Sequence, residues 1–140
     1  MSFTATSRRL GDSLRQEIDV NGRHTIHTDE PASLGGDDTA PTPHELLPAI
    51  LASCVTTMVA LYAKNKGWEL DDLSARVDYD NKAEPRQFDV TLNLPEGLTG
   101  DQVARLQKVA DTCPVRRALE AEVNFDERVE IGTTAPVGTA

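Results

Sequence analysis

The sequence predicts a small α+β protein that combines antiparallel hairpins with helices. Three observations predict it. An Asn-Gly step separates two strand-like runs, an apolar segment follows a capping box at Thr42, and two alternating segments precede a second capped helix at Thr99. We expect one domain over 1–131 and a flexible tail over 132–140.

Composition excludes some classes of function. Lys and Arg total 14 against 23 Asp and Glu, so the net charge of -9 disfavours binding to nucleic acid. The N-terminal region lacks the basic residues followed by an apolar run that are typical of a signal peptide. The apolar stretch 46–62 is interrupted by polar residues. We therefore expect a cytoplasmic protein without a membrane span.

The first predicted unit is a hairpin over 13–29. Its strand-like runs flank Asn21-Gly22, and Asn-Gly is the strongest short hairpin signal. From Glu30 to Pro43 the chain is rich in Pro, Gly, Asp and Thr, which predicts a surface loop without a regular element.

A long helix follows this loop. Thr42 and Glu45 form a T-x-x-E capping box around Pro43, and Gly67 supplies a stop after Lys66. Apolar spacing predicts a buried stripe with a cysteine near its middle. The stripe consists of Leu47, Ile50, Leu51, Cys54, Met58 and Leu61.

A second hairpin is predicted further along the chain. Residues 73–79 and 88–94 alternate apolar and polar side chains, which is the period of half-buried strands. The charged stretch 81–86 joins them.

Two helices and a strand complete the prediction. Thr99 begins a capped helix that ends near Cys113, and Pro114 suits the first turn of another helix over 115–121. Residues 123–131 then resemble a last strand.

The two cysteines do not form a metal site by spacing. Cys54 and Cys113 are 59 residues apart, which matches no zinc motif. His24 and His27 are three apart on a predicted strand and so point to opposite faces. We expect no metal and no cofactor, and in a reducing compartment two cysteines are more often redox-active thiols than a structural disulfide.

Thiol chemistry would place distinct demands on each cysteine. Burial should raise the pKa of Cys54, so a cation must reach it, with Arg15 preferred over Arg9 and Arg8. Cys113 at a helix N-terminus suits an accessible resolving thiolate. Equally, Cys54 can be a core residue, Cys113 a helix cap, and Arg15 an ordinary strand residue.

Two segments resemble a known family. The segment 29–70 contains P-x-E-L-L, then apolar residues, then Cys54, and ADTCPV over 110–115 contains Cys113. In order and spacing both resemble the family of osmotically inducible protein C and the organic hydroperoxide resistance proteins, in the branch similar to osmotically inducible protein C.

The resemblance implies an intertwined α+β homodimer, with antiparallel sheets packed on a central cysteine-bearing helix and active sites at the dimer interface. It implies that Cys54 reacts with alkyl or fatty-acid hydroperoxides and that Cys113 resolves the sulfenic acid as a Cys54-Cys113 disulfide. An external dithiol, of lipoyl type by resemblance, would then reduce the enzyme during oxidative stress. The family's arginine and glutamate would correspond to Arg15 and Glu45.

The position of Glu45 leaves alternatives open. In hydroperoxide resistance members the glutamate directly follows the proline, where this chain has His44. Nine residues of helix advance about 13 Å and place Glu45 on the face opposite Cys54. Glu45 can therefore orient an arginine, serve the partner's site, or only cap the helix.

A different function is also compatible with this sequence. The apolar residues Leu47, Ile50, Leu51 and Met58 would favour apolar hydroperoxides if they line a pocket, or they are core packing. A protein of the same fold could instead bind a lipid or another small molecule without peroxidase turnover.

Overall fold

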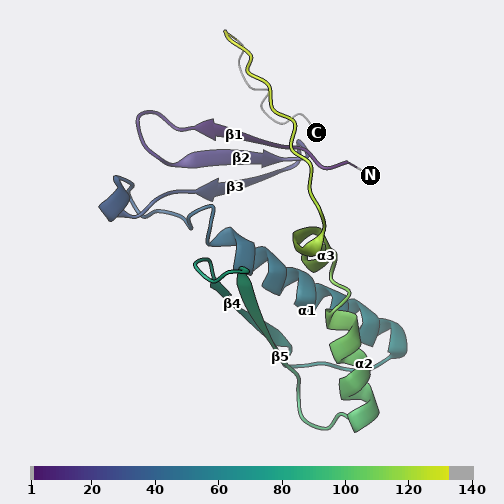
Figure 1. Cartoon of the computed structure of the whole chain (residues 1–140). Coiled ribbons are helices and arrows are strands. Elements are labelled where there is room, and N and C mark those ends of the chain that lie inside the picture. The colour runs from purple at the N-terminus through teal and green to yellow at the C-terminus, as the bar shows by residue number, and fades with distance from the viewer. Residues whose placement is uncertain (1, 133–140) are drawn as a thin grey trace. The chain divides into compact units, whose positions relative to one another are not determined.

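The computed structural model describes residues 2–132, which form two compact units. The first contains the described residues up to Leu46 and those from Phe125 onward, and the second is Leu47–Asn124. The described residues form one three-stranded and one two-stranded antiparallel sheet, together with helices (Figure 1). This content confirms the predicted α+β class.

The three-stranded sheet has the order β1-β2-β3, with β1 at Ala5–Arg9, β2 at Gln16–Val20 and β3 at His24–Thr28. Asn21 and Gly22 both have positive φ, of 55° and 70°, and make the predicted turn between β2 and β3. The hairpin is thus confirmed, whereas β1 was not predicted from the sequence.

The loop over 30–43 is closed on itself. The amide of Asp38 donates to the carbonyl oxygen of Glu30 at 3.0 Å, and a Cβ at Gly36 would lie 1.9 Å from that oxygen. Only glycine fits so close an approach. The prediction that the loop holds no regular element is wrong for one 3₁₀ turn, η1 at Ala32–Leu34.

Helix α1 spans Leu46–Lys66, so it begins later than predicted, and the predicted capping box forms in the turn before it. The Thr42 amide donates to Glu45 Oε1 at 3.0 Å, and the Glu45 amide donates to Thr42 Oγ1 at 3.2 Å. Gly67, with φ of 72°, follows the last helical residue.

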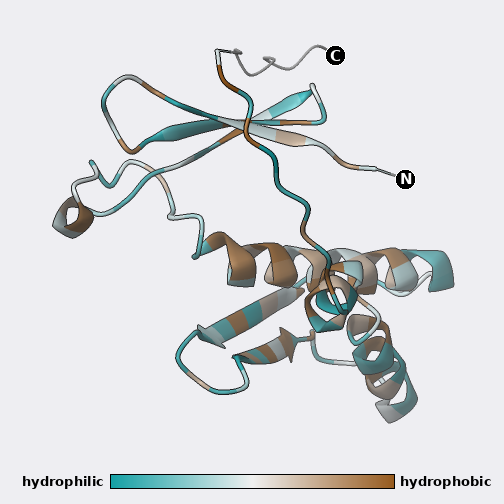
Figure 2. Ribbon diagram, turned by 45° about the horizontal axis from the view of Figure 1, so that its top comes forward, coloured by the Kyte–Doolittle hydropathy of each residue, from teal (hydrophilic) through white to brown (hydrophobic). Residues whose placement is uncertain are grey.

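The predicted buried stripe of α1 is confirmed for Leu51 and wrong for Ile50 and Leu61. Ile50 and Leu61 are 47% and 52% exposed. Apolar residues surround the helix along most of its length (Figure 2), so their spacing does not select one face. The residues that are buried recur every four positions and are Leu51, Val55, Val59 and Ala63.

The two-stranded sheet joins β4 at Ser74–Asp80 to β5 at Gln87–Asn93, which confirms the second hairpin. Polar and apolar residues alternate along both strands (Figure 2). Tyr79 stacks on its cross-strand partner Phe88 with ring centroids 4.3 Å apart. Apolar side chains of this hairpin pack against the core of the second unit.

Helix α2 spans Gly100–Ala110 with the predicted capping box at Thr99, and α3 spans Pro114–Glu120 with Cys113 as its N-cap. By length and composition alone α1 could cross a membrane. Its four buried residues instead pack with α2 in the core of this unit. The core residues are Leu51, Val55, Val59, Ala63, Leu106, Ala110 and Cys113.

The predicted last strand over 123–131 is wrong for the chain as described. This segment has no regular secondary structure, and its apolar side chains are exposed. A strand needs a neighbouring strand to accept and donate its backbone hydrogen bonds, and no described strand pairs with it. Of the predicted tail, 133–140 lies outside the described residues.

Candidate active site

The structure brings the two cysteines together although they are 59 residues apart in the sequence. Cys54 lies half-buried on α1 and packs against the core that contains Cys113, the N-cap of α3, and the two thiols interact. Both cysteines are free thiols. The arrangement places a second thiol where it can attack an oxidised Cys54.

The pKa of Cys54 is raised above its ordinary value. Burial is the main cause, and the hydrogen bond and charge of Cys113 raise it further. The backbone N–H of Val115 donates to Cys54 and opposes this shift. The predicted effect of burial on the pKa of Cys54 is confirmed.

Sequence reasoning missed Val115 as a contributor to the site. Val115 lies in the first turn of α3 after Pro114, where backbone amides have no acceptor within the helix. The Cys-Pro pair in the sequence could have indicated this donor, but only the fold shows that it reaches Cys54.

Cys113 is less accessible than predicted. It is 0% exposed because it belongs to the core formed with α1 and α2. Its side chain also makes no capping hydrogen bond to α3. Within the chain, the Cys113 thiol can therefore react only with its neighbours in the core, and Cys54 is one of them.

Two of the three candidate arginines are held within their own sheet. Arg8 Nη2 lies 3.0 Å from Glu17 Oε1 in an ion pair across β1 and β2. Arg9 uses Nε and Nη2 to bind the carbonyl oxygens of Ser13 and Asp12, each at 2.7 Å. Arg8 is thus neutralised, and Arg9 is committed to the turn after β1.

Arg15 lies immediately before β2, where the sequence placed it on the strand. Its Nη1 donates to Thr39 Oγ1 at 2.6 Å and to the Thr39 carbonyl oxygen at 3.3 Å. Among the described residues, no carboxylate lies within ion-pair distance of its guanidinium. Arg15 therefore has no direct ion-pair partner in the described part of the chain.

Glu45 is occupied by the helix cap. Its pKa is lowered by the hydrogen bond from the Thr42 amide and then by that from the Thr42 side chain. Across residues 2–132 its carboxylate makes no ion pair with an arginine. The capping alternative is confirmed, while a catalytic role stays a prediction.

His24 and His27 do not belong to a cluster of metal-ligating side chains in the described residues. His27 Nε2 lies 3.9 Å from Glu17 Oε2, and His24 lies three residues earlier on β3. The described part of the chain contains no group of three or more His, Cys, Asp or Glu side chains that could hold a metal ion.

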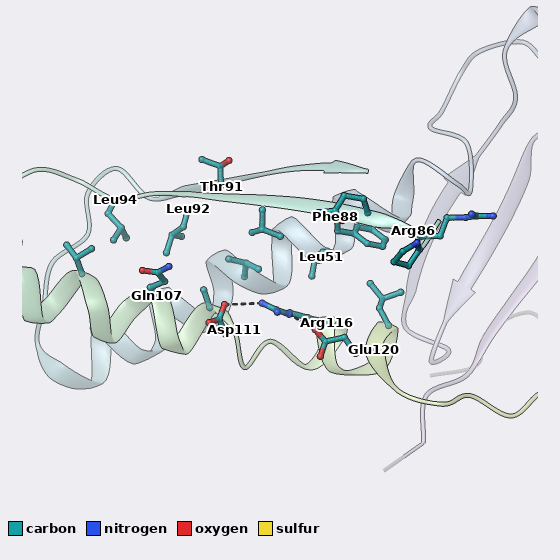
Figure 3. Close-up of a pocket in the computed structure, with 17 residues that line it drawn as sticks. Leu51, Arg86, Phe88, Thr91, Leu92, Leu94, Gln107, Asp111, Arg116 and Glu120 are labelled. Atoms are coloured by element: carbon teal, nitrogen blue, oxygen red, sulfur yellow. Dashed lines mark hydrogen bonds and ion pairs between the residues drawn. The ribbon is translucent and has the colours of Figure 1, made fainter. Parts of the chain in front are cut away.

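A pocket of about 890 Å³ lies within the second unit (Figure 3). Leu51 lines it as predicted, but Leu47, Ile50 and Met58 do not. Arg116 also lines it and is bound to Asp111 at 3.0 Å and to Glu120 at 2.7 Å. Further lining residues include Val55, Arg86, Phe88, Leu92, Leu94 and Gln107.

Comparison with known proteins identifies relatives of the chain. Residues 35–128 match the family model described as OsmC-like protein. An osmotic stress induced and detoxification response protein from Psychrobacter arcticus has 26% identity and a TM-score of 0.70, covering 84% of this chain and 88% of that one. No match among curated protein sequences was found.

Two further solved structures share the fold at lower identity. An organic hydroperoxide resistance protein from Legionella pneumophila has 22% identity and a TM-score of 0.56, covering 86% of this chain and 90% of that one. An OsmC-like protein of unknown function from Vibrio cholerae has 14% identity and a TM-score of 0.58, covering 86% and 94%.

Proposed function

The chain belongs to the OsmC-like family, and from this premise we propose that it is a cysteine-based peroxidase that reduces organic hydroperoxides. The observation that carries the proposal is the interaction between the side chains of Cys54 and Cys113, because two adjacent thiols could form a disulfide once one of them is oxidised. The names of the Legionella protein and of a Bacillus subtilis neighbour, both hydroperoxide resistance proteins, add support.

The reaction proceeds in three balanced steps. The Cys54 thiolate attacks the terminal peroxide oxygen, the O–O bond breaks, and the alkoxide takes a proton to leave as an alcohol. Cys113 then attacks the sulfenic acid sulfur, forming a disulfide and releasing water. An external dithiol, of lipoyl type, restores both thiols by exchange and leaves as its own disulfide.

Arg15 is the residue proposed to supply positive charge to the peroxide and the Cys54 thiolate. No carboxylate among the described residues pairs with it directly, and Nε and Nη2 carry donors beyond those bound to Thr39. Glu45 acts mainly as the cap of α1, and any further role would be to orient an arginine or to serve the partner's site.

We place this activity in a cytoplasmic homodimer that defends against oxidative stress. The exposed apolar residues Ile50 and Leu61 on α1, and Phe125, Val129 and Ile131 near the C-terminus, support a partner surface. A reducing cytoplasm keeps both thiols available between turnovers.

A turnover assay with cumene hydroperoxide and dihydrolipoamide tests the proposal. Cys54→Ser should abolish turnover, because the hydroxyl cannot form a sulfenic acid. Ser53→Ala is the matched control, since Ser53 is an exposed neighbour on the same helix, and it should keep full activity. Full turnover in Cys54→Ser would refute the proposed mechanism.

The pocket in the second unit favours one alternative function. Its volume of about 890 Å³ and its apolar wall residues would suit a lipid-like or other small ligand. On this alternative, oleate raises the melting temperature and both thiols survive peroxide. Thiol loss on peroxide treatment, with no thermal shift from oleate, would exclude it.

A further inference from the structure

The loop over 30–43 holds Arg15 through two consecutive hydrogen bonds, in which the Thr39 hydroxyl links Arg15 to Asp29. Arg15 Nη1 donates to Thr39 Oγ1 at 2.6 Å, and Thr39 Oγ1 lies 2.6 Å from Asp29 Oδ2. A guanidinium only donates and an ionised carboxylate only accepts, so the hydroxyl must accept from Arg15 and donate to Asp29.

Asp29 is the last acceptor in this series of hydrogen bonds, and its own position is fixed. It is 1% exposed, and its carboxylate also accepts from the amides of Glu30 at 2.8 Å and Thr39 at 3.0 Å. Hydrogen bonds from Thr39 are the first causes that lower the pKa of Asp29 to about 2. The carboxylate therefore stays ionised and holds Thr39 in one orientation.

The backbone around Thr39 is equally constrained. The Asp29 amide donates to the Pro41 carbonyl oxygen at 3.0 Å, which ties the start of the loop to its end. The close approach of Gly36 to Glu30 fixes the loop between these points. Thr39 is thus held by both its side chain and its loop.

We propose that Asp29 and Thr39 are positioning residues that hold the Arg15 guanidinium ready for an anionic or peroxide ligand, and this inference rests on the proposed function. Asp29 makes no direct ion pair with Arg15, because the hydroxyl of Thr39 links the two groups. The arrangement fixes the guanidinium through Nη1 and leaves the donors on Nε and Nη2 for the ligand.

Substitutions at Thr39 separate positioning from folding. Thr39→Val keeps the shape but removes the hydroxyl, and should lower kcat/KM for cumene hydroperoxide about tenfold, as for a lost hydrogen bond to a charged group. Under the proposed function, in which Arg15 stabilises the Cys54 thiolate, it should also shift the pH profile of Cys54 alkylation by iodoacetamide to higher pH. Thr39→Ser should restore both values.

Two controls make the outcome decisive. Ser33→Ala changes an exposed hydroxyl in the same loop and should match wild type. Arg15→Ala should shift the alkylation profile at least as far as Thr39→Val. A Thr39→Val protein with the wild-type profile and kcat/KM would overturn the inference, as would equal losses in Thr39→Val and Thr39→Ser that follow melting temperature alone.

The alkylation profile does not depend on turnover, so it distinguishes two failures. If wild type consumes no hydroperoxide, the proposed function has failed, and the profiles of the Thr39 variants still judge the positioning role. If wild type turns over and Arg15→Ala is inactive while Thr39→Val is unchanged, only the positioning role has failed.

Discussion

Cys54 shows at the scale of one residue how a fold sets the reactivity of a thiol. Burial and Cys113 raise its pKa, while the Val115 amide lowers it. The apolar spacing in the sequence indicated that Cys54 is buried, and the family resemblance suggested that it pairs with Cys113. It could not indicate the Val115 contact or the support of Arg15 by Thr39, because both join segments that are distant in the chain.

Removing Cys113 should lower the pKa of Cys54. Both the hydrogen bond and the charge of Cys113 raise that pKa, so Cys113→Ala removes two of its causes. Alkylation of Cys54 followed by mass spectrometry should begin at lower pH in Cys113→Ala than in wild type. An unchanged or higher midpoint would contradict this description of the pair.

Asp29 should make the protein sensitive to acid. Its pKa falls from 3.8 to about 2 on folding, so its stabilising contribution is complete above 3.8 and is lost as pH drops toward 2. Urea unfolding at pH 7 and pH 3 should show a smaller loss on acidification in Asp29→Asn than in wild type. Equal losses in both proteins would show that other groups govern acid stability.

Single elements were predicted well where their signals are local. The capping boxes at Thr42 and Thr99 and the Asn-Gly turn each depend on a few adjacent residues. Strand β1 was missed because its residues show no apolar alternation and it exists by pairing with β2. The buried face of α1 was misjudged because the helix is apolar on all sides.

The packing of α1 on α2 should depend on Leu106, which is 0% exposed. Leu106→Ala should reduce the free energy of unfolding by about 2–5 kcal/mol, through lost burial and the cavity that remains. Leu34→Ala, at a residue that is 66% exposed, should change it by less than about 0.5 kcal/mol. Similar losses in urea unfolding would contradict the assigned core.

At the scale of the whole molecule, the sequence could not show which surfaces a partner covers. The alternating segment 123–131 predicts a strand, yet it has no pairing strand among the described residues. Its exposed apolar side chains are instead available to a partner, as in the proposed homodimer.

The C-terminal segment should control assembly. We expect analytical ultracentrifugation to find the full chain dimeric and a chain ending at Asn124 monomeric, with circular dichroism showing that helices persist. Removing only 133–140 is the matched control and should leave the dimer intact. A monomeric full chain, or a dimer after truncation at Asn124, would contradict this role.

The central claim is that Cys54 and Cys113 form a peroxidatic pair, and counting thiols tests it most directly. Fully reduced protein is treated with one equivalent of cumene hydroperoxide, and free thiols and intact mass are measured before and after. We predict the loss of both thiols and a mass decrease of two hydrogens, with no such change in Cys54→Ser. Two intact thiols and an unchanged mass in wild type would contradict the claim.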